Sequence, residues 1–174
     1  MDNAHDGLKW LVDQWTLKLA GILESMTDQR PEAIWKATSL EDGDSAKIPE
    51  NSLVWRQILS LSPEPAVWIA APEPVWRDLG GRALQAGGAR NTWLEVVNRS
   101  VTALVPELSR RARREIVCEK GEETPEAPPN LRFIPVEVSY AAERLRLFIA
   151  FSPQLIEAAG TSGESEVLGD DLIP

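Results

Sequence analysis

The sequence predicts an α+β fold with internal pseudo-twofold symmetry, in which a long helix, three strands and a short helix occur twice. Three observations lead to this prediction. Two long stretches carry apolar residues at helical spacing, three strand-like runs follow each of them, and the second set repeats the first. Neither half could bury a three-stranded sheet alone. We therefore expect one mixed, mostly antiparallel six-stranded sheet with both long helices packed on one face.

The first half begins with an amphipathic helix at residues 8–26, which Arg30 and Pro31 end. The acidic stretch 41–45 then separates the first two strands, and the turn 62–65 joins the next two as a hairpin. The remaining elements expected in this half are strands at 33–40, 52–61 and 66–71 and a short helix at 72–84.

The second half follows a glycine-rich break at Gly87 and Gly88. Asn91 is the expected N-cap of the second long helix, 91–108, and residues 120–130, rich in proline and acids, are expected to form a loop. The other expected elements are strands at 115–119, 131–140 and 144–151 and a short helix at 152–160.

The register of the repeat is clearest in the two hairpins. An offset of 80 residues aligns Trp68-Ile69-Ala70 with Phe148-Ile149-Ala150. A similar offset, near 83, aligns Trp10-Leu11 with Trp93-Leu94. All seven tryptophans lie in expected helices or strands, so we interpret them as core and layer-interface residues.

The length of 174 residues fits one domain, which we place at residues 1–160, followed by an acidic tail or linker at 161–174 toward a further domain. The chain carries 18 basic and 27 acidic residues, a net charge of −9. This balance argues against a nucleic-acid partner or an anionic membrane surface and suits a basic partner.

Cysteine and histidine usage limits the chemistry further. Cys118 is the single cysteine, which excludes an internal disulfide and fits a reducing compartment. With His5 as the single histidine and no cysteine cluster, we expect no metal site and no cofactor of the chain's own. Because no apolar run is long enough to cross a bilayer and the N-terminus lacks a signal-peptide profile, we expect no membrane insertion and a cytoplasmic protein.

Three polar residues of the second long helix form the candidate site. Asn91, Glu95 and Asn98 are four and three residues apart, so they lie within about one helical turn of each other, at the border of the apolar stripe. In the simplest interpretation Asn91 caps the helix, Glu95 stabilises its positive end and Asn98 is solvated. The alternative is a carboxylate and a carboxamide held side by side to act on a partner.

The two helix and three-strand units, with Glu95-x-x-Asn98 on the second long helix, resemble the CheC/CheX/FliY group of chemotaxis proteins and the related middle domain of the motor-switch protein FliM. The pattern of that group is an Asp or Ser, three residues, Glu, two residues, Asn, and a proline farther along the chain. Residues 100–104 continue the helix as in that group, and the tail 161–174 resembles the junction ahead of the small C-terminal domain of FliN/FliY proteins.

The chain departs from the group's pattern at several positions. Asn91 stands where the acidic or hydroxyl residue is expected. The expected proline position falls at Gly121, and the nearest downstream proline is Pro125. In the first half, the register puts Val12 and Trp15 where Glu and Asn would stand, so the chain would hold one copy of the motif, as in CheX.

The resemblance implies hydrolysis of the aspartyl phosphate of a CheY-type response regulator. Asn98 would hold the attacking water, and Glu95 would pair with the lysine of the receiver domain, which brings its own Mg²⁺. The implied partners are this regulator and the flagellar switch proteins, and the implied location is peripheral at the flagellar basal body. A homodimer is left open.

Two alternatives to a phosphatase remain. The first is a non-catalytic motor-switch scaffold of the FliM/FliN kind, in which the motif is only helix surface. The second is an unrelated dimeric α+β ligand-binding domain, which an enclosed apolar pocket between the halves would favour.

Overall fold

The computed structural model describes residues 3–36, 47–60, 65–83, 88–125, 131–140 and 142–160. The first half contains α1 (Asn3–Thr27), β1 (Glu32–Ile34), β2 (Ser52–Leu59), β3 (Pro65–Pro72) and α3 (Glu73–Arg82). The second half contains α4 (Gly88–Ala112), β4 (Cys118–Thr124), β5 (Ile134–Tyr140), β6 (Glu143–Phe151) and a helix at 153–160. The expected repeat of a long helix, three strands and a short helix is confirmed.

One sheet of six strands carries the fold, in the order β1-β5-β6-β3-β2-β4, and every neighbouring pair is antiparallel. β3 and β6 meet at its centre, where Ile69 lies directly opposite Ile149. The halves also exchange their first strands, because β1 pairs with β5 of the second half and β4 pairs with β2 of the first. Neither half therefore has a complete sheet of its own.

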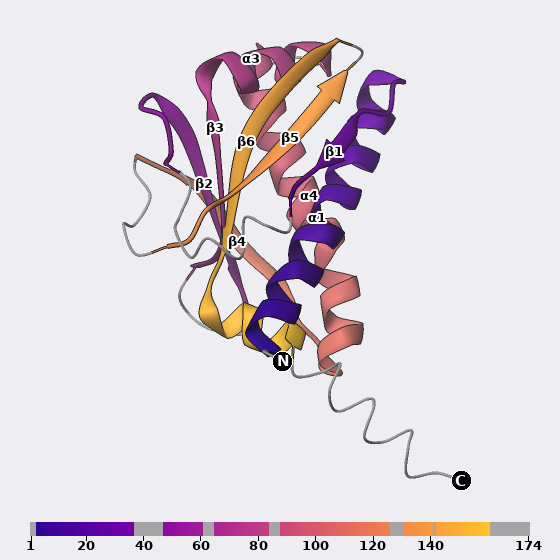
Figure 1. Cartoon of the computed structure of the whole chain (residues 1–174), viewed down its shortest axis with the longest axis vertical. Coiled ribbons are helices and arrows are strands. Elements are labelled where there is room, and N and C mark those ends of the chain that lie inside the picture. Colours follow the sequence, from indigo (N-terminus) through magenta and orange to yellow (C-terminus); the bar gives the residue numbers. More distant parts are fainter. Residues whose placement is uncertain are drawn as a thin grey trace, which may run out of the picture.

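The two long helices cover one face of this sheet and lie side by side, as Figure 1 shows. Their apolar stripes fill the space against the strands, and the fully buried side chains include Leu11, Trp15, Leu19, Trp93 and Leu104. Each such side chain contributes roughly 1.5–3 kcal/mol of transfer free energy when it leaves water. No described helix is long and apolar enough to cross a membrane.

The ends of several elements differ from the sequence-based expectation. The expected strand 33–40 reaches only from Glu32 to Ile34, and residues 37–46 lie outside the described part of the chain. The expected strand 115–119 instead runs from Cys118 to Thr124, into the stretch expected to be a loop. β4 is an edge strand, and its charged sequence is typical of one. Because this sequence lacks alternating apolar residues, the pattern did not predict the full strand.

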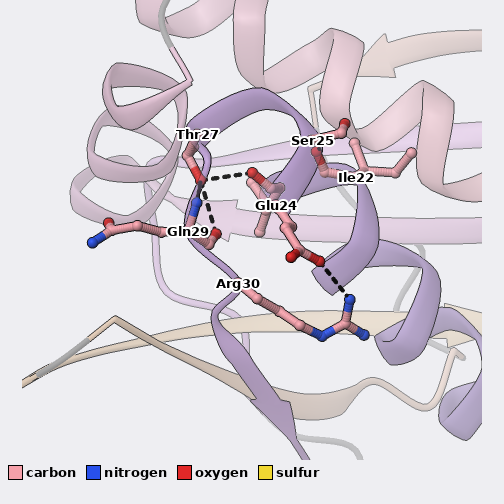
Figure 2. Close-up of polar contacts among 7 residues, drawn as sticks. Ile22, Glu24, Ser25, Thr27, Gln29 and Arg30 are labelled. Carbon is pink, nitrogen blue, oxygen red and sulfur yellow. Dashed lines mark hydrogen bonds and ion pairs between the residues drawn. The ribbon is translucent and has the colours of Figure 1, made fainter.

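A cap formed by Thr27 ends α1 and directs the chain into β1 (Figure 2). The Thr27 hydroxyl lies 2.7 Å from the carbonyl oxygen of Leu23 and 2.9 Å from that of Gln29, and it accepts the Gln29 backbone N–H at 3.2 Å. Arg30 reaches back to pair with Glu24 at 2.9 Å. These contacts satisfy polar groups that a helix leaves open at its C-terminus.

The opposite face of the sheet carries a second, smaller apolar cluster. Val54, Trp68 and Phe148 are buried there with Phe133, and Ile48 and Leu131 pack against them. Segments 47–49 and 131–133 thus cover part of this outer face, while the helices cover the inner one.

Candidate functional site

The candidate residues lie on the exposed side of α4, opposite the stripe that faces the sheet. Trp93, Val97 and Leu104 of that stripe are buried. The helical period turns Asn91 and Asn98 outward, and both are exposed. The structure thus brings Asn91, Glu95 and Asn98 onto one solvent-facing row, which we name the α4 row.

Asn91 does not cap the helix as we expected. α4 begins at Gly88, whose φ of 90° suits glycine, so Asn91 lies inside the first turn. The missed signal is Gly88 itself, which can start the helix after the glycine-rich break. Asn91 is thereby placed one turn before Glu95, on the same face.

Glu95 is 41% exposed and forms an ion pair of 2.5 Å with Arg99, one turn farther along the helix. Both partners face solvent, and an exposed pair of this kind contributes only about 0.3–0.5 kcal/mol. The Glu95 carboxylate can therefore exchange Arg99 for a cation of a docked partner at little cost.

Asn98 presents an uncommitted carboxamide. Its side chain makes no hydrogen bond to any residue of the described ranges, and only its backbone carbonyl oxygen is engaged, accepting the Thr102 hydroxyl at 2.8 Å. A carboxamide offers two N–H donors and an acceptor oxygen, so it can orient a water molecule without titrating.

Thr102 extends the row toward the sheet edge and was missed in the sequence analysis. Its Oγ1 lies 3.7 Å from the Sγ of Cys118, the first residue of β4. Burial raises the pKa of the Cys118 thiol, and the contact with Thr102 opposes part of that rise. No spacing rule links residues 102 and 118, so the contact could not be predicted from periodicity.

Ion pairs hold α4 on both sides of the row. Arg90 pairs with Glu123 of β4, and Glu107 pairs with Lys18 of α1 at 3.1 Å. These pairs link α4 to the sheet edge on one side and to α1 on the other, while the buried stripe packs the helix onto the sheet.

The first half presents no equivalent row at the positions expected from the repeat. Val12 and Trp15 are both fully buried, so they contact the core and cannot reach a partner.

Glycine occupies the position of the expected proline because the neighbouring strand leaves no room for a side chain there. Gly121 lies in β4 opposite Gln57, and a Cβ there would overlap the Trp55 ring and lie 2.7 Å from Gln57 Oε1. That crowding excludes proline as well, and Pro125 comes directly after the strand.

The row contains no cluster of metal ligands, and the described residues hold no group of three or more His, Cys, Asp or Glu that could bind a metal ion. A carboxylate and a carboxamide on a stiff helix can instead pair with a cation and position water on a partner's surface.

No protein-family model matches this chain, and no curated protein matches it. Several solved structures match the chain. Thermotoga maritima FliY matches with a TM-score of 0.68 at 10% identity, over 95% of this chain and 98% of that one. The FliM–SpeE complex from H. pylori gives a TM-score of 0.67 at 11% identity, over 100% of this chain and 99% of that one. The chemotaxis protein CheX from Vibrio vulnificus gives 0.51 at 14% identity, over 82% of this chain and 99% of that one.

These similarities show that the chain has the CheC-like fold of chemotaxis and flagellar switch proteins, as expected from the sequence. At 10–14% identity the likeness concerns the fold alone.

Proposed function

We propose that the chain is a chemotaxis or flagellar motor-switch domain that binds a phosphorylated CheY-type receiver through the α4 row and hydrolyses its aspartyl phosphate. The observation that carries the proposal is the exposed Asn98 carboxamide, unengaged by described side chains and one turn from the Glu95 carboxylate. Similar folds in FliY, FliM and CheX support the chemotaxis setting.

In this proposal α4 docks against the receiver's phosphorylation site. Glu95 leaves Arg99 and pairs with the receiver's lysine, which fixes the docking register. The Asn98 carboxamide oxygen then accepts a hydrogen bond from a water molecule and holds it in line with the phosphorus. A lone pair of the water oxygen stays free to attack.

The bond from water oxygen to phosphorus forms as the bond to the aspartyl oxygen breaks, giving inorganic phosphate and the aspartate carboxylate. Asn98 takes up no proton during this step, and the water's proton leaves with the phosphate or to solvent. The receiver's own Mg²⁺ balances the phosphoryl charge, so the chain contributes positioning alone.

The second candidate is a non-catalytic switch scaffold with the same docking face. The single, imperfect motif favours it, because Asn91 replaces an acid and the first half buries Val12 and Trp15. An unrelated ligand-binding domain has less support, since a layer of buried side chains, including Ile69 and Ile149, fills the centre of the sheet where the halves meet.

The test measures phosphate loss from a phosphorylated CheY-type receiver with Mg²⁺ present, at saturating concentrations of each variant. We expect acceleration by the wild type, loss of acceleration with retained binding in Asn98→Ala, and weakened binding in Glu95→Gln. Gln154→Ala is the matched control, because it removes another exposed helical carboxamide. Binding without acceleration by the wild type would support the scaffold, and absence of both would reject the docking face.

A further inference from the structure

A second surface, independent of the α4 row, lies on the outer face of the sheet. An open cavity of about 370 Å³ occupies the β1, β5 and β6 end of that face. Ile34 lies opposite Glu137, and Glu137 lies opposite Arg146, so these three form one row across the strands. Their strand neighbours Val136 and Val138 are fully buried, so the row faces away from the core. We name this hollow the outer-face cavity.

Positive charge dominates the outer-face cavity. Lys36, Arg144 and Arg146 line it together with one carboxylate, Glu137. None of the three cations forms an ion pair with a described residue. Arg56 forms an ion pair with Glu122 on the neighbouring strand. Arg146 lies opposite Glu137 in the same way, but these two side chains form no ion pair. A protein with a net charge of −9 thus gathers three cations here that have no ion pair to the described part of the chain.

The spacing of the two arginines sets the kind of ligand. Arg144 and Arg146 are two residues apart on one strand, so both side chains leave the same face about 7 Å apart. Alternate side chains of an extended peptide have this same spacing, and guanidinium groups bind carboxylates with two parallel hydrogen bonds.

One apolar side chain borders the outer-face cavity. Ile34 is 47% exposed and lines the cavity. Trp35, the next residue, also borders the cavity, but its indole N–H donates a 2.8 Å hydrogen bond to Asp13 of α1 and its ring packs against the helix-side core. Ile34 is therefore the side chain on the outer face that can receive an apolar group of a ligand.

We propose that the outer-face cavity binds an extended acidic segment of a partner protein. Two carboxylates at alternate positions pair with Arg144 and Arg146, and a neighbouring apolar side chain packs on Ile34. A peptide fits better than a nucleic acid, because three cations beside a carboxylate cannot offset the repulsion between a polyphosphate and a chain of charge −9. This surface leaves α4 accessible, so both sites can be occupied together.

The test uses fluorescence anisotropy of a labelled peptide, Gly-Glu-Val-Glu-Val-Leu-Gly, with the full chain. We expect saturable binding that weakens as salt rises, and at least about tenfold weaker binding when both glutamates of the peptide are glutamines. The double variant Arg144→Glu/Arg146→Glu should lose binding, and Arg144→Gln/Arg146→Gln should weaken it while disturbing the fold less. The matched control is Arg113→Glu/Arg114→Glu, which reverses the charge at two exposed positions outside the cavity. This variant should bind the peptide like the wild type.

Three results would overturn the proposal. The first is no binding by the wild type. The second is equal weakening in the Arg113/Arg114 control, which would mean attraction by overall charge alone. The third is stronger binding in Glu164→Gln/Glu166→Gln, which would assign the outer-face cavity to the chain's own acidic tail in place of a partner.

Discussion

The indole nitrogen of Trp15 donates a 2.9 Å hydrogen bond to the hydroxyl of Ser100, 85 residues away, and both side chains are fully buried. The two residues occupy the same position in α1 and α4, counted from the start of each helix. Ser100 in turn donates to the carbonyl oxygen of Val97 at 2.7 Å. This contact joins the long helices of the two halves, as Ile69 opposite Ile149 joins their strands in the sheet.

Ser100→Ala should lower the free energy of unfolding by about 1–3 kcal/mol, because it leaves the buried Trp15 N–H without a partner. Urea unfolding measures this loss, and Ser25→Ala, an exposed serine of α1, is the control. In a Trp15→Phe background, where no indole N–H needs a partner, the same substitution should cost clearly less. An equal cost in both backgrounds would contradict the assigned bond.

Gly121→Ala should destabilise the protein by about 1–3 kcal/mol, because the added methyl group overlaps the Trp55 ring and Gln57 Oε1 where β4 meets β2. Gly81→Ala is the matched control. Nothing lies within 4 Å of a Cβ at Gly81, so that substitution in α3 should stabilise by about 0.5–1 kcal/mol. Thermal unfolding of both variants checks the pair, and a neutral Gly121→Ala would show that Trp55 and Gln57 move aside.

Stability should fall on acidification in part through Glu107. Its contacts with Arg110 at 2.6 Å and Lys18 at 3.1 Å lower the pKa of the Glu107 carboxyl below its ordinary value of 4.5. The unfolded chain therefore binds this proton at higher pH than the folded one, and the contribution, under about 1 kcal/mol for so accessible a pair, is lost as pH falls through 4.5 and below.

Glu107→Gln should flatten this part of the profile. The measurement is the urea unfolding free energy at neutral pH and near pH 3.5, with the exposed Glu115→Gln as control. If Glu107→Gln loses as much stability as the wild type between the two pH values, the contacts with Arg110 and Lys18 do not stabilise the folded state.

Local patterns predicted the elements and the layers but not the identity of every strand partner. Apolar spacing located both long helices, and the 80-residue offset that aligns Ile69 with Ile149 also describes their pairing. The exchange of β1 and β4 between the halves was not predicted, since period-two alternation shows which face of a strand is buried and says nothing of its neighbour.

The candidate site shows the same limit. Helical periodicity predicted that Asn91, Glu95 and Asn98 share a face, because all three lie on one helix. Thr102 lies beside Cys118, and Ile34 shares a row with Arg146 across the outer face, with Glu137 between them; the members of each set come from separate segments of the sequence. Only the folded sheet brings such residues together.

Arg99→Ala tests how Glu95 is used in the proposed docking. The substitution removes an exposed ion pair, so the free energy of unfolding should change by less than about 0.5 kcal/mol. It also frees the Glu95 carboxylate from its competitor. If Glu95 pairs with a lysine of the receiver, affinity should therefore rise about two- to threefold at low salt, and the gain should shrink at high salt.

Titration of a labelled, phosphorylated receiver with wild type, Arg99→Ala, Glu95→Gln and the double variant measures this effect. The gain should vanish in the Glu95→Gln background, because no carboxylate is left to release. A gain that persists there would mean that Arg99 opposes docking by its own charge. A loss of affinity in Arg99→Ala would mean that Arg99 itself contacts the receiver, and the α4 row would then have to be extended to include a cation.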